Sequence, residues 1–92
     1  MKYRIRTTKQ FDRDMKRIEK RGYDIRKLQE VIGLLASGEP LPQKYKGHVL
    51  SGDKLGIRDC HITPNWLLLY IINGIDLILL LQRTGTHSCV FE

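Results

Sequence analysis

Two apolar segments on either side of Asn73-Gly74 restrict the possible folds of this chain more than any other feature. Residues 66–72 read Trp-Leu-Leu-Leu-Tyr-Ile-Ile, and residues 75–83 are mostly Ile and Leu. Asn-Gly is a preferred sequence of the two-residue type I′ hairpin turn. We therefore expect two long antiparallel strands, and because both are apolar on both sides, each face of their sheet needs a cover.

The first half of the chain has helical periodicity instead. Apolar residues recur at helical spacing from Phe11 to Ile18. Thr7 and Gln10 fit a capping box that starts this helix, because each side chain can bond the other's free backbone amide. Gly22 is expected to end it.

A second helix is expected after Asp24, a candidate N-cap, with Tyr23 and Leu28 placed as a hydrophobic staple. Its apolar stripe consists of Ile25, Leu28, Val31, Ile32 and Leu35. Gly38 and Pro40 end it. Because the connection between the two helices is short, we expect them to lie antiparallel and adjacent and to cover one face of the strands.

The remaining segments complete a pattern with a helical first half and a stranded second half. Residues 3–6 alternate as a short first strand, residues 43–50 form a loop or short strand, and residues 55–62 form a strand before a turn at Pro64-Asn65. The length indicates one α+β domain over residues 1–92. The strand face away from the helices keeps a surplus of apolar surface, which predicts a partner or a groove there.

The charge of the chain favours a polyanionic partner. It has 92 residues, with 16 Lys and Arg against 10 Asp and Glu, and a net charge of +6. Such a field concentrates nucleic acid near a small domain. Met1 is followed by charged residues rather than by a signal sequence, so we expect a cytoplasmic protein with Cys60 and Cys89 reduced and no membrane span.

The histidines are the best candidates for chemistry on RNA. Cleavage requires that a 2′-hydroxyl lose a proton and that the leaving 5′-oxygen gain one, and histidine does either near neutral pH. His48, His61 and His87 all lie outside the expected helices. Arg83 offers a guanidinium that fits phosphate oxygens, and Phe91 is a candidate stacking ring for a base. Arg83, His87 and Phe91 stand four residues apart, so local coiling would bring them to one groove.

Each candidate also has a purely structural interpretation, which the residues alone leave open. His87 is also consistent with an ordinary surface residue, and Arg83 with a solvated strand end. His61 alternates with Asp59 as a paired strand residue would. Asp59 and Arg58 can anchor a strand by an ion pair, Phe91 can be a hydrophobic plug, and Trp66 can belong to the core.

Metal and thiol chemistry are weaker alternatives. Cys60, His61, His87 and Cys89 are zinc-ligand types. However, adjacent residues of a strand point to opposite faces, and His87-x-Cys89 is too short for a usual ligand pair. Nothing in the sequence marks either cysteine as an activated nucleophile.

The sequence resembles the YafQ branch of the RelE superfamily of toxin–antitoxin toxins along nearly its whole length. Four ordered blocks carry the resemblance. They are Leu41-Pro42 with Tyr45-Lys46-Gly47-His48-Val49-Leu50, then Gly56-Ile57-Arg58-Asp59-Cys60-His61-Ile62, Pro64-Asn65-Trp66-Leu67-Leu68-Leu69-Tyr70 and Arg83-Thr84-Gly85-Thr86-His87.

The resemblance implies a RelE-like α+β fold, with two N-terminal helices packed on a twisted, mainly antiparallel sheet of four to five strands. It implies cleavage of messenger RNA in the ribosomal A site, without a metal or other cofactor. The partner would be a cognate antitoxin that wraps the toxin and blocks its groove, and operator DNA would be reached only through that antitoxin.

The resemblance also assigns roles to single residues. His87 would be the leading proton-transfer residue, as the general acid, and His48 and His61 would share the remaining proton and phosphate work. Arg83 would stabilise the phosphate. The residues expected to bind RNA are Trp66, Phe91, Asn65, Lys46 and Lys44.

Asn65 departs from the family pattern, which commonly has Asp between this Pro and this Trp. An amide can orient a hydroxyl or water but cannot accept a proton as a carboxylate does. We therefore expect an orienting role for Asn65.

Two alternative functions remain at this point. One is a toxin of the RelE/ParE fold without RNA cleavage, which the three histidines disfavour. The other is a basic RNA- or ribosome-binding module.

Overall fold

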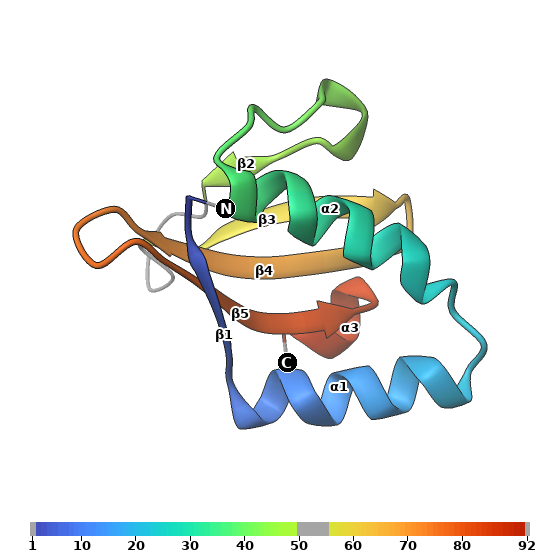
Figure 1. Cartoon of the computed structure of the whole chain (residues 1–92). Helices are drawn as coiled ribbons and strands as arrows, with labels where there is room; N and C mark the ends of the chain where they lie inside the picture. Colours follow the sequence, from blue (N-terminus) through green and yellow to red (C-terminus); the bar gives the residue numbers. More distant parts are fainter. Residues whose placement is uncertain (1, 50–55, 92) are drawn as a thin grey trace.

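The computed structural model describes residues 2–49 and 56–91 and has an α+β fold (Figure 1). Five strands form one sheet in the order β1-β5-β4-β3-β2. β1 is parallel to β5, and the other neighbours are antiparallel. The elements in chain order are β1 (Arg4–Thr7), α1 (Lys9–Lys20), α2 (Ile25–Ser37), the 3₁₀ helix η1 (Gln43–Tyr45), β2 (His48–Val49), β3 (Arg58–Thr63), β4 (Trp66–Asn73), β5 (Ile78–Gly85) and α3 (His87–Val90). The expected fold class is confirmed.

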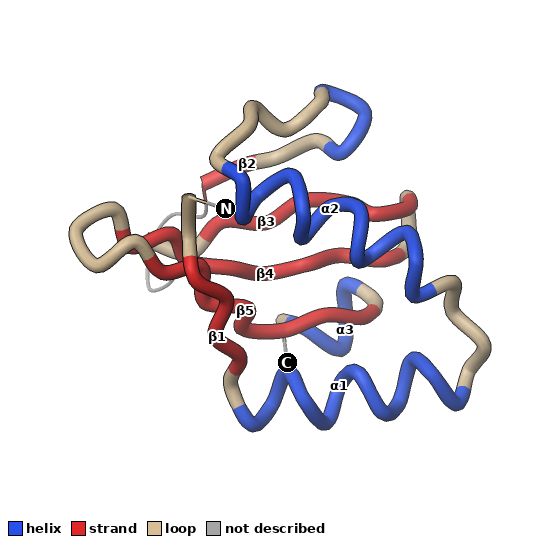
Figure 2. Tube along the Cα trace, viewed as in Figure 1, coloured by secondary structure: helices blue, strands red, loops and turns tan. Residues whose placement is uncertain are grey.

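The two long helices cover one face of the sheet but do not lie side by side. α1 follows β5, whereas α2 crosses the sheet over β4 and β3, and the helices diverge from their connection (Figures 1 and 2). Each helix therefore covers a different part of the sheet. The close antiparallel pair expected from the short connection is wrong, because the wide sheet needs both helices as separate covers.

α1 begins one residue later than the sequence predicts. Its N-cap is Thr8, whose Oγ1 accepts a hydrogen bond from the Phe11 N–H at 3.0 Å. The expected cap, Thr7, instead belongs to β1 and pairs with Leu81. Strand pairing with β5 thus shifts the start of the helix. The predicted end is correct, because Gly22 follows α1 with φ +79°.

The ends of α2 are as predicted. The Asp24 side chain accepts a hydrogen bond from the Arg26 N–H at 3.1 Å. Gly38 closes the helix in the left-handed conformation with φ +79°. Both caps follow from local sequence, since they involve only residues next to the helix.

The hairpin between β4 and β5 is antiparallel, as predicted, but its turn is longer. Asn73 pairs with Ile78, so residues 74–77 form a four-residue loop rather than a two-residue type I′ turn, and β5 begins at Ile78. The Asn73 side chain accepts hydrogen bonds from the Ile75 and Asp76 N–H groups, both at 3.0 Å. This local bonding stabilises the wider loop.

The predicted strand over residues 55–62 corresponds to β3, which begins at residue 58. Its expected start, Leu55, and the expected end of the preceding loop, Leu50, lie outside the described residues.

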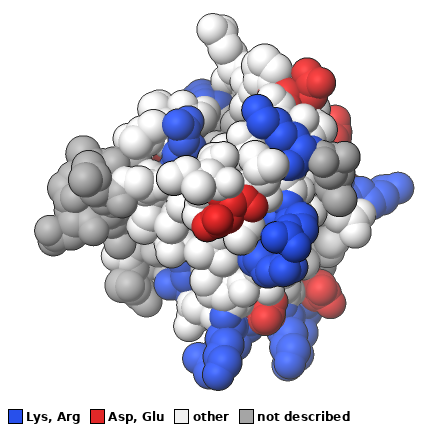
Figure 3. Space-filling model, turned by 60° about the vertical axis from the view of Figure 1, so that its left-hand side comes forward, with Lys and Arg blue, Asp and Glu red and all other residues white. Residues whose placement is uncertain are grey.

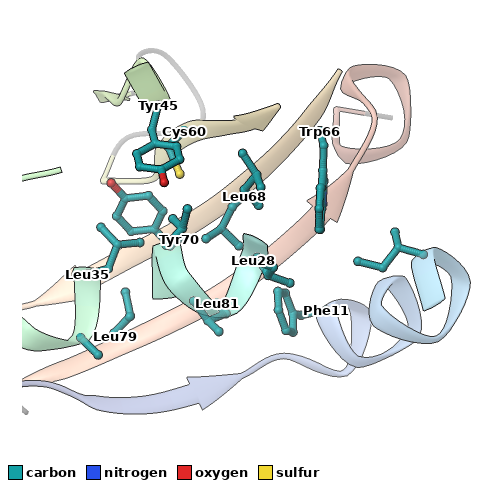
Figure 4. Close-up of a cluster of buried hydrophobic side chains, with 14 residues drawn as sticks. Phe11, Leu28, Leu35, Tyr45, Cys60, Trp66, Leu68, Tyr70, Leu79 and Leu81 are labelled. Atoms are coloured by element: carbon teal, nitrogen blue, oxygen red, sulfur yellow. The ribbon is translucent and has the colours of Figure 1, made fainter. Parts of the chain in front are cut away.

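The main core lies between the sheet and the two long helices (Figure 4). It contains Phe11 and Ile18 from α1, and α2 contributes Leu28, Val31, Leu35 and Ala36. The sheet contributes alternate residues of its strands, as a one-sided packing requires. These are Cys60, Ile62, Trp66, Leu68, Tyr70, Leu79 and Leu81.

A smaller cluster on the opposite sheet face accounts for part of the apolar surplus noted in the sequence. Leu67 and Leu69 of β4 pack against Val90 of α3, with Ile57 and Phe91 at the margin. The C-terminal segment therefore covers part of this face. Ile75 remains 95% exposed at the hairpin loop. No helix in the described part of the chain is long and apolar enough to cross a membrane.

Candidate active site

His48 and His61 lie on the sheet face that α3 partly covers. His48 pairs with Asp59, and His61 pairs with Leu67. Directly paired residues of antiparallel strands project from the same face. Since Leu67 belongs to the cluster that contacts α3, both histidines share a face with the helix that carries His87.

The loop before β2 forms basic hollows beside two of the histidines. Tyr45 is buried and anchors the loop, and Lys46 follows it with a positive φ of 48°. One hollow of about 300 Å³ is lined by Lys46 and His48, among other residues. A smaller one of about 100 Å³ is lined by Lys44, Lys46 and His61. Lysine and histidine around a surface hollow suit a phosphate.

Positive charge extends well beyond these hollows. Figure 3 shows lysine and arginine side chains at several places on one face of the molecule, interspersed with acidic side chains. The net charge of +6 is therefore displayed on the surface, where it can attract a polyanion.

The segment after β5 turns sharply and places His87 at the start of α3. Gly85 has φ +142°, which an L side chain rarely adopts. Thr86 caps α3 by accepting a hydrogen bond from the Cys89 N–H at 3.4 Å. His87 is exposed, and its ring centroid lies 4.6 Å from that of Phe91 at an angle of 49°. The expected local coiling thus brings His87 and Phe91 together.

Phe91 serves as a packing residue as well as a neighbour of His87. It is half-buried against Leu67 and Leu69. This packing favours the hydrophobic interpretation of Phe91, and base stacking stays a prediction.

Arg83 contacts α1 and α3 and is not among the residues that line the lysine hollows. Its Nε donates to Asp14 Oδ2 at 2.8 Å, and its Nη2 donates to the Cys89 carbonyl oxygen at 2.8 Å. Its side chain is 21% exposed. The structure thus places this expected phosphate ligand in a part-buried ion pair with α1.

Trp66 lies in the core and Asn65 lies on the surface of the turn before it. Trp66 is 3% exposed, and its Nε1 donates to Thr84 Oγ1 at 2.8 Å. Tyr23 packs edge-on against its ring, with centroids 4.9 Å apart. This burial favours the core interpretation of Trp66. Asn65 borders a hollow of about 220 Å³ with Tyr23 and Lys27, on the side of the helices.

Two acidic residues gain importance from the structure. Asp59 is 7% exposed, and its Oδ1 lies 3.6 Å from His48 Nδ1 but has no hydrogen-bond partner among the described residues. Asp14 is fully buried and was not singled out in the sequence. The available signal was its position on the same helical stripe as Phe11 and Ile18, where a charged residue is unusual.

The buried thiol of Cys60 on β3 and the buried phenol of Tyr70 on β4 do not ionise at neutral pH. Burial, reinforced by the charge of Asp59, raises the pKa of Cys60 to about 12. Burial is also the main cause that raises the pKa of Tyr70 to about 12. Cys60 therefore lacks the thiolate that a nucleophile needs. It faces the main core while His61 faces the other side, as expected for neighbours in a strand.

Comparisons with known proteins first give the class of protein. A family model described as the bacterial toxin of type II toxin–antitoxin system, YafQ, matches residues 3–92. The mRNA interferase toxin YafQ of Escherichia coli K12 is 41% identical over 83 residues, which are 89% of this chain and 88% of the relative.

Solved structures agree with this match along the whole chain. A metal-bound toxin from Helicobacter pylori has a TM-score of 0.91 at 43% identity, covering 99% of this chain and 100% of that chain. The toxin of the E. coli DinJ–YafQ toxin–antitoxin complex has a TM-score of 0.88 at 38% identity, covering 100% of both chains.

The fold and these matches define a toxin of the bacterial type II toxin–antitoxin class. More narrowly, the chain belongs to the YafQ family. The resemblance seen in the four sequence blocks is confirmed. The name of the E. coli relative, an mRNA interferase, agrees with the endoribonuclease that the resemblance implies.

Proposed function

We propose that this toxin is an endoribonuclease that cuts messenger RNA in the ribosomal A site by metal-independent acid–base chemistry. The observation that carries the proposal is the sharing of one sheet face by His48, His61 and the helix of His87, next to the hollows of Lys44 and Lys46. The proposal is supported by membership of the YafQ family, whose Escherichia coli relative is named an mRNA interferase.

The reaction needs only groups that this face provides. The 2′-hydroxyl oxygen of the RNA attacks the adjacent phosphorus, and its proton passes to His48 or His61. As the bond from phosphorus to the 5′-oxygen breaks, His87 gives that oxygen a proton. The products are a 2′,3′-cyclic phosphate and a 5′-hydroxyl. Lys44 and Lys46 stabilise the phosphate charge, and the half-buried Phe91 ring serves as a stacking surface for a base.

A cognate antitoxin is the proposed protein partner, in the cytoplasm where ribosomes translate. The E. coli relative was solved in complex with its antitoxin DinJ, which supports this partner. An antitoxin segment lying over the His87 face would block both RNA entry and the basic hollows. Any contact with operator DNA would then be made by the antitoxin.

His87→Ala is the first test of the proposal. We expect cleavage of a translated message on purified ribosomes, mapped by primer extension, to fall by about 10²–10⁴-fold, because a general acid contributes roughly that factor. Wild-type cuts should persist when the toxin alone is treated with EDTA and desalted before it is added to ribosomes, which themselves need Mg²⁺. Ser88→Ala, at the exposed next position of α3, is the matched control and should cut normally.

The possible failures of this test are distinct. Unchanged cuts in folded His87→Ala would remove His87 from the chemistry. Cuts lost when only the toxin has been stripped with EDTA, and restored by adding a metal ion back to it, would contradict the metal-independent mechanism. If the wild type makes no cuts but still binds ribosomes, the alternative of a basic ribosome-binding module or a RelE/ParE-fold toxin without nuclease activity is correct.

A further inference from the structure

A single carboxylate on α1 binds the end of β5 through several donors. Asp14 is fully buried. Its Oδ2 accepts from Arg83 Nε at 2.8 Å and from the Thr84 N–H at 3.1 Å. Its Oδ1 accepts from Arg17 Nη2 at 2.6 Å and, at longer distance, from Gln10 and Arg83 Nη2. Asp14 therefore organises the meeting point of α1 with the last strand.

This carboxylate is charged in the folded protein. Burial by itself would raise the pKa of Asp14. Hydrogen bonds from Arg83 and from the Thr84 N–H, together with the charge of Arg83, outweigh burial and lower the pKa below its ordinary value of 3.8. A buried anion with two arginine partners is a fixed point, since moving either partner leaves a desolvated charge.

Arg83 extends this fixed point to α3. While Nε and Nη2 face Asp14, the same Nη2 donates to the Cys89 carbonyl oxygen at 2.8 Å. Cys89 belongs to the single turn of helix that begins at His87. So short a helix has little stability of its own, and its position depends on such tertiary contacts.

We propose that Asp14 and Arg83 are positioning residues that hold α3, and with it His87, in the orientation required for proton transfer. This inference rests on the proposed function, in which His87 is the general acid. It assigns the effect of Arg83 on the reaction to the link Asp14–Arg83–Cys89 and not to contact with the phosphate. Misplacement of a catalytic group by about 1 Å costs on the order of 10²-fold in rate.

Four variants separate the two roles of Arg83. They are Asp14→Asn, Arg83→Lys, the double variant and the control Asp12→Asn, which removes the same charge at an exposed position of α1. Lysine keeps the positive charge but cannot form the forked link to both Asp14 and the carbonyl. We expect Asp14→Asn and Arg83→Lys each to lower kcat at least tenfold with KM within threefold, and Asp12→Asn to retain wild-type rates.

The double variant gives the decisive comparison. If both residues act through one link, adding Arg83→Lys to Asp14→Asn lowers kcat by less than a further twofold. If Arg83 instead binds the phosphate, Arg83→Lys keeps most of the rate and its effect persists in full in that background. A nearly normal rate for Arg83→Lys, or an undiminished effect of Arg83→Lys in the Asp14→Asn background, overturns the inference. Cooperative thermal unfolding checks that each variant is folded.

A readout without RNA keeps this test independent of the proposed function. The His87 ring protons sense the ring current of Phe91, 4.6 Å away. We expect their NMR shifts to move toward solvent-exposed values in Asp14→Asn and Arg83→Lys, and to stay unchanged in Asp12→Asn. Unchanged His87 shifts in folded Asp14→Asn would overturn the inference. A wild-type protein that cuts no RNA would instead overturn only the proposed nuclease function.

Discussion

The side chains proposed for chemistry differ in how tightly their neighbours hold them. His48 has a side chain that is 64% exposed beside Asp59, and His87 is exposed beside Phe91. Arg83, in contrast, is bound to Asp14 and to a backbone carbonyl. Exposed histidines can approach an RNA that arrives on the surface, whereas the arginine is fixed before any substrate binds.

Asn65 provides a prediction at the scale of one residue. It is exposed in the turn before β4 and borders a hollow on the helix side of the sheet. On the expectation that Asn65 orients groups and transfers no proton, Asn65→Asp should leave the cleavage rate within about threefold of wild type, with the same pH profile. Primer extension across a pH series measures this. A variant that cleaves many-fold faster with an altered pH profile would mean that a carboxylate at position 65 accepts a proton in the reaction and that Asn65 makes the site less active.

At the scale of elements, the helix ends reflect two different causes. The caps of α2, Asp24 and Gly38, involve only neighbouring residues, and the sequence predicts them correctly. The cap of α1 depends on β5, because Thr8 also donates its hydroxyl to the Gln82 carbonyl oxygen at 2.8 Å. One side chain thus joins β1, α1 and β5.

Thr8→Ala and Thr7→Ala test this assignment of the α1 cap. Thr8→Ala should lower the free energy of unfolding by about 1–2 kcal/mol, since it removes an N-cap acceptor and a donor to β5. Thr7→Ala changes an exposed strand residue and should cost less than about 0.5 kcal/mol. Urea unfolding followed by circular dichroism measures both. Equal losses, or a larger loss for Thr7→Ala, would show that the capping box of the sequence is the real one.

At the scale of the whole molecule, the fully buried carboxylate of Asp14 lies within a basic protein. The surplus positive charges of the protein repel one another. The carboxylate of Asp14 offsets part of this repulsion through its ion pairs with Arg17 and Arg83. The removal of a buried partner from such a group costs on the order of 3 kcal/mol. This is a large share of the stability of a domain of this size, typically about 5–15 kcal/mol.

Acid unfolding should reveal the contribution of Asp14. Its pKa is lowered in the folded state, so its contribution is complete above the ordinary value of 3.8 and disappears as the pH falls below it toward the folded-state pKa. The unfolding free energies of wild type and Asp14→Asn should therefore differ by a constant amount at neutral pH and converge below pH 3.8. Asp12→Asn should follow the wild type throughout. A difference that is independent of pH down to acid unfolding would contradict a charged Asp14.

The sequence by itself predicted the features that depend on short stretches of chain. The apolar pattern predicted β4 and its antiparallel partner, and the caps Asp24 and Gly38 set the limits of α2. The four sequence blocks indicated the family. The three histidines followed from residue type alone, and whether they act together remains a prediction that the structure supports but activity must test.

Only the tertiary structure determined how distant residues combine. Asp14 and Arg83 are 69 positions apart, so no local pattern could pair them, and a lone arginine at a strand end is typical of the surface. The position of α3 over Leu67 and Leu69 likewise depends on a sharp turn at Gly85 and on packing with another strand. Local rules set the limits of α2, because the hydrogen bonds of its caps close within a few residues. The site arises where separate elements meet, and such contacts are defined only once the chain has folded.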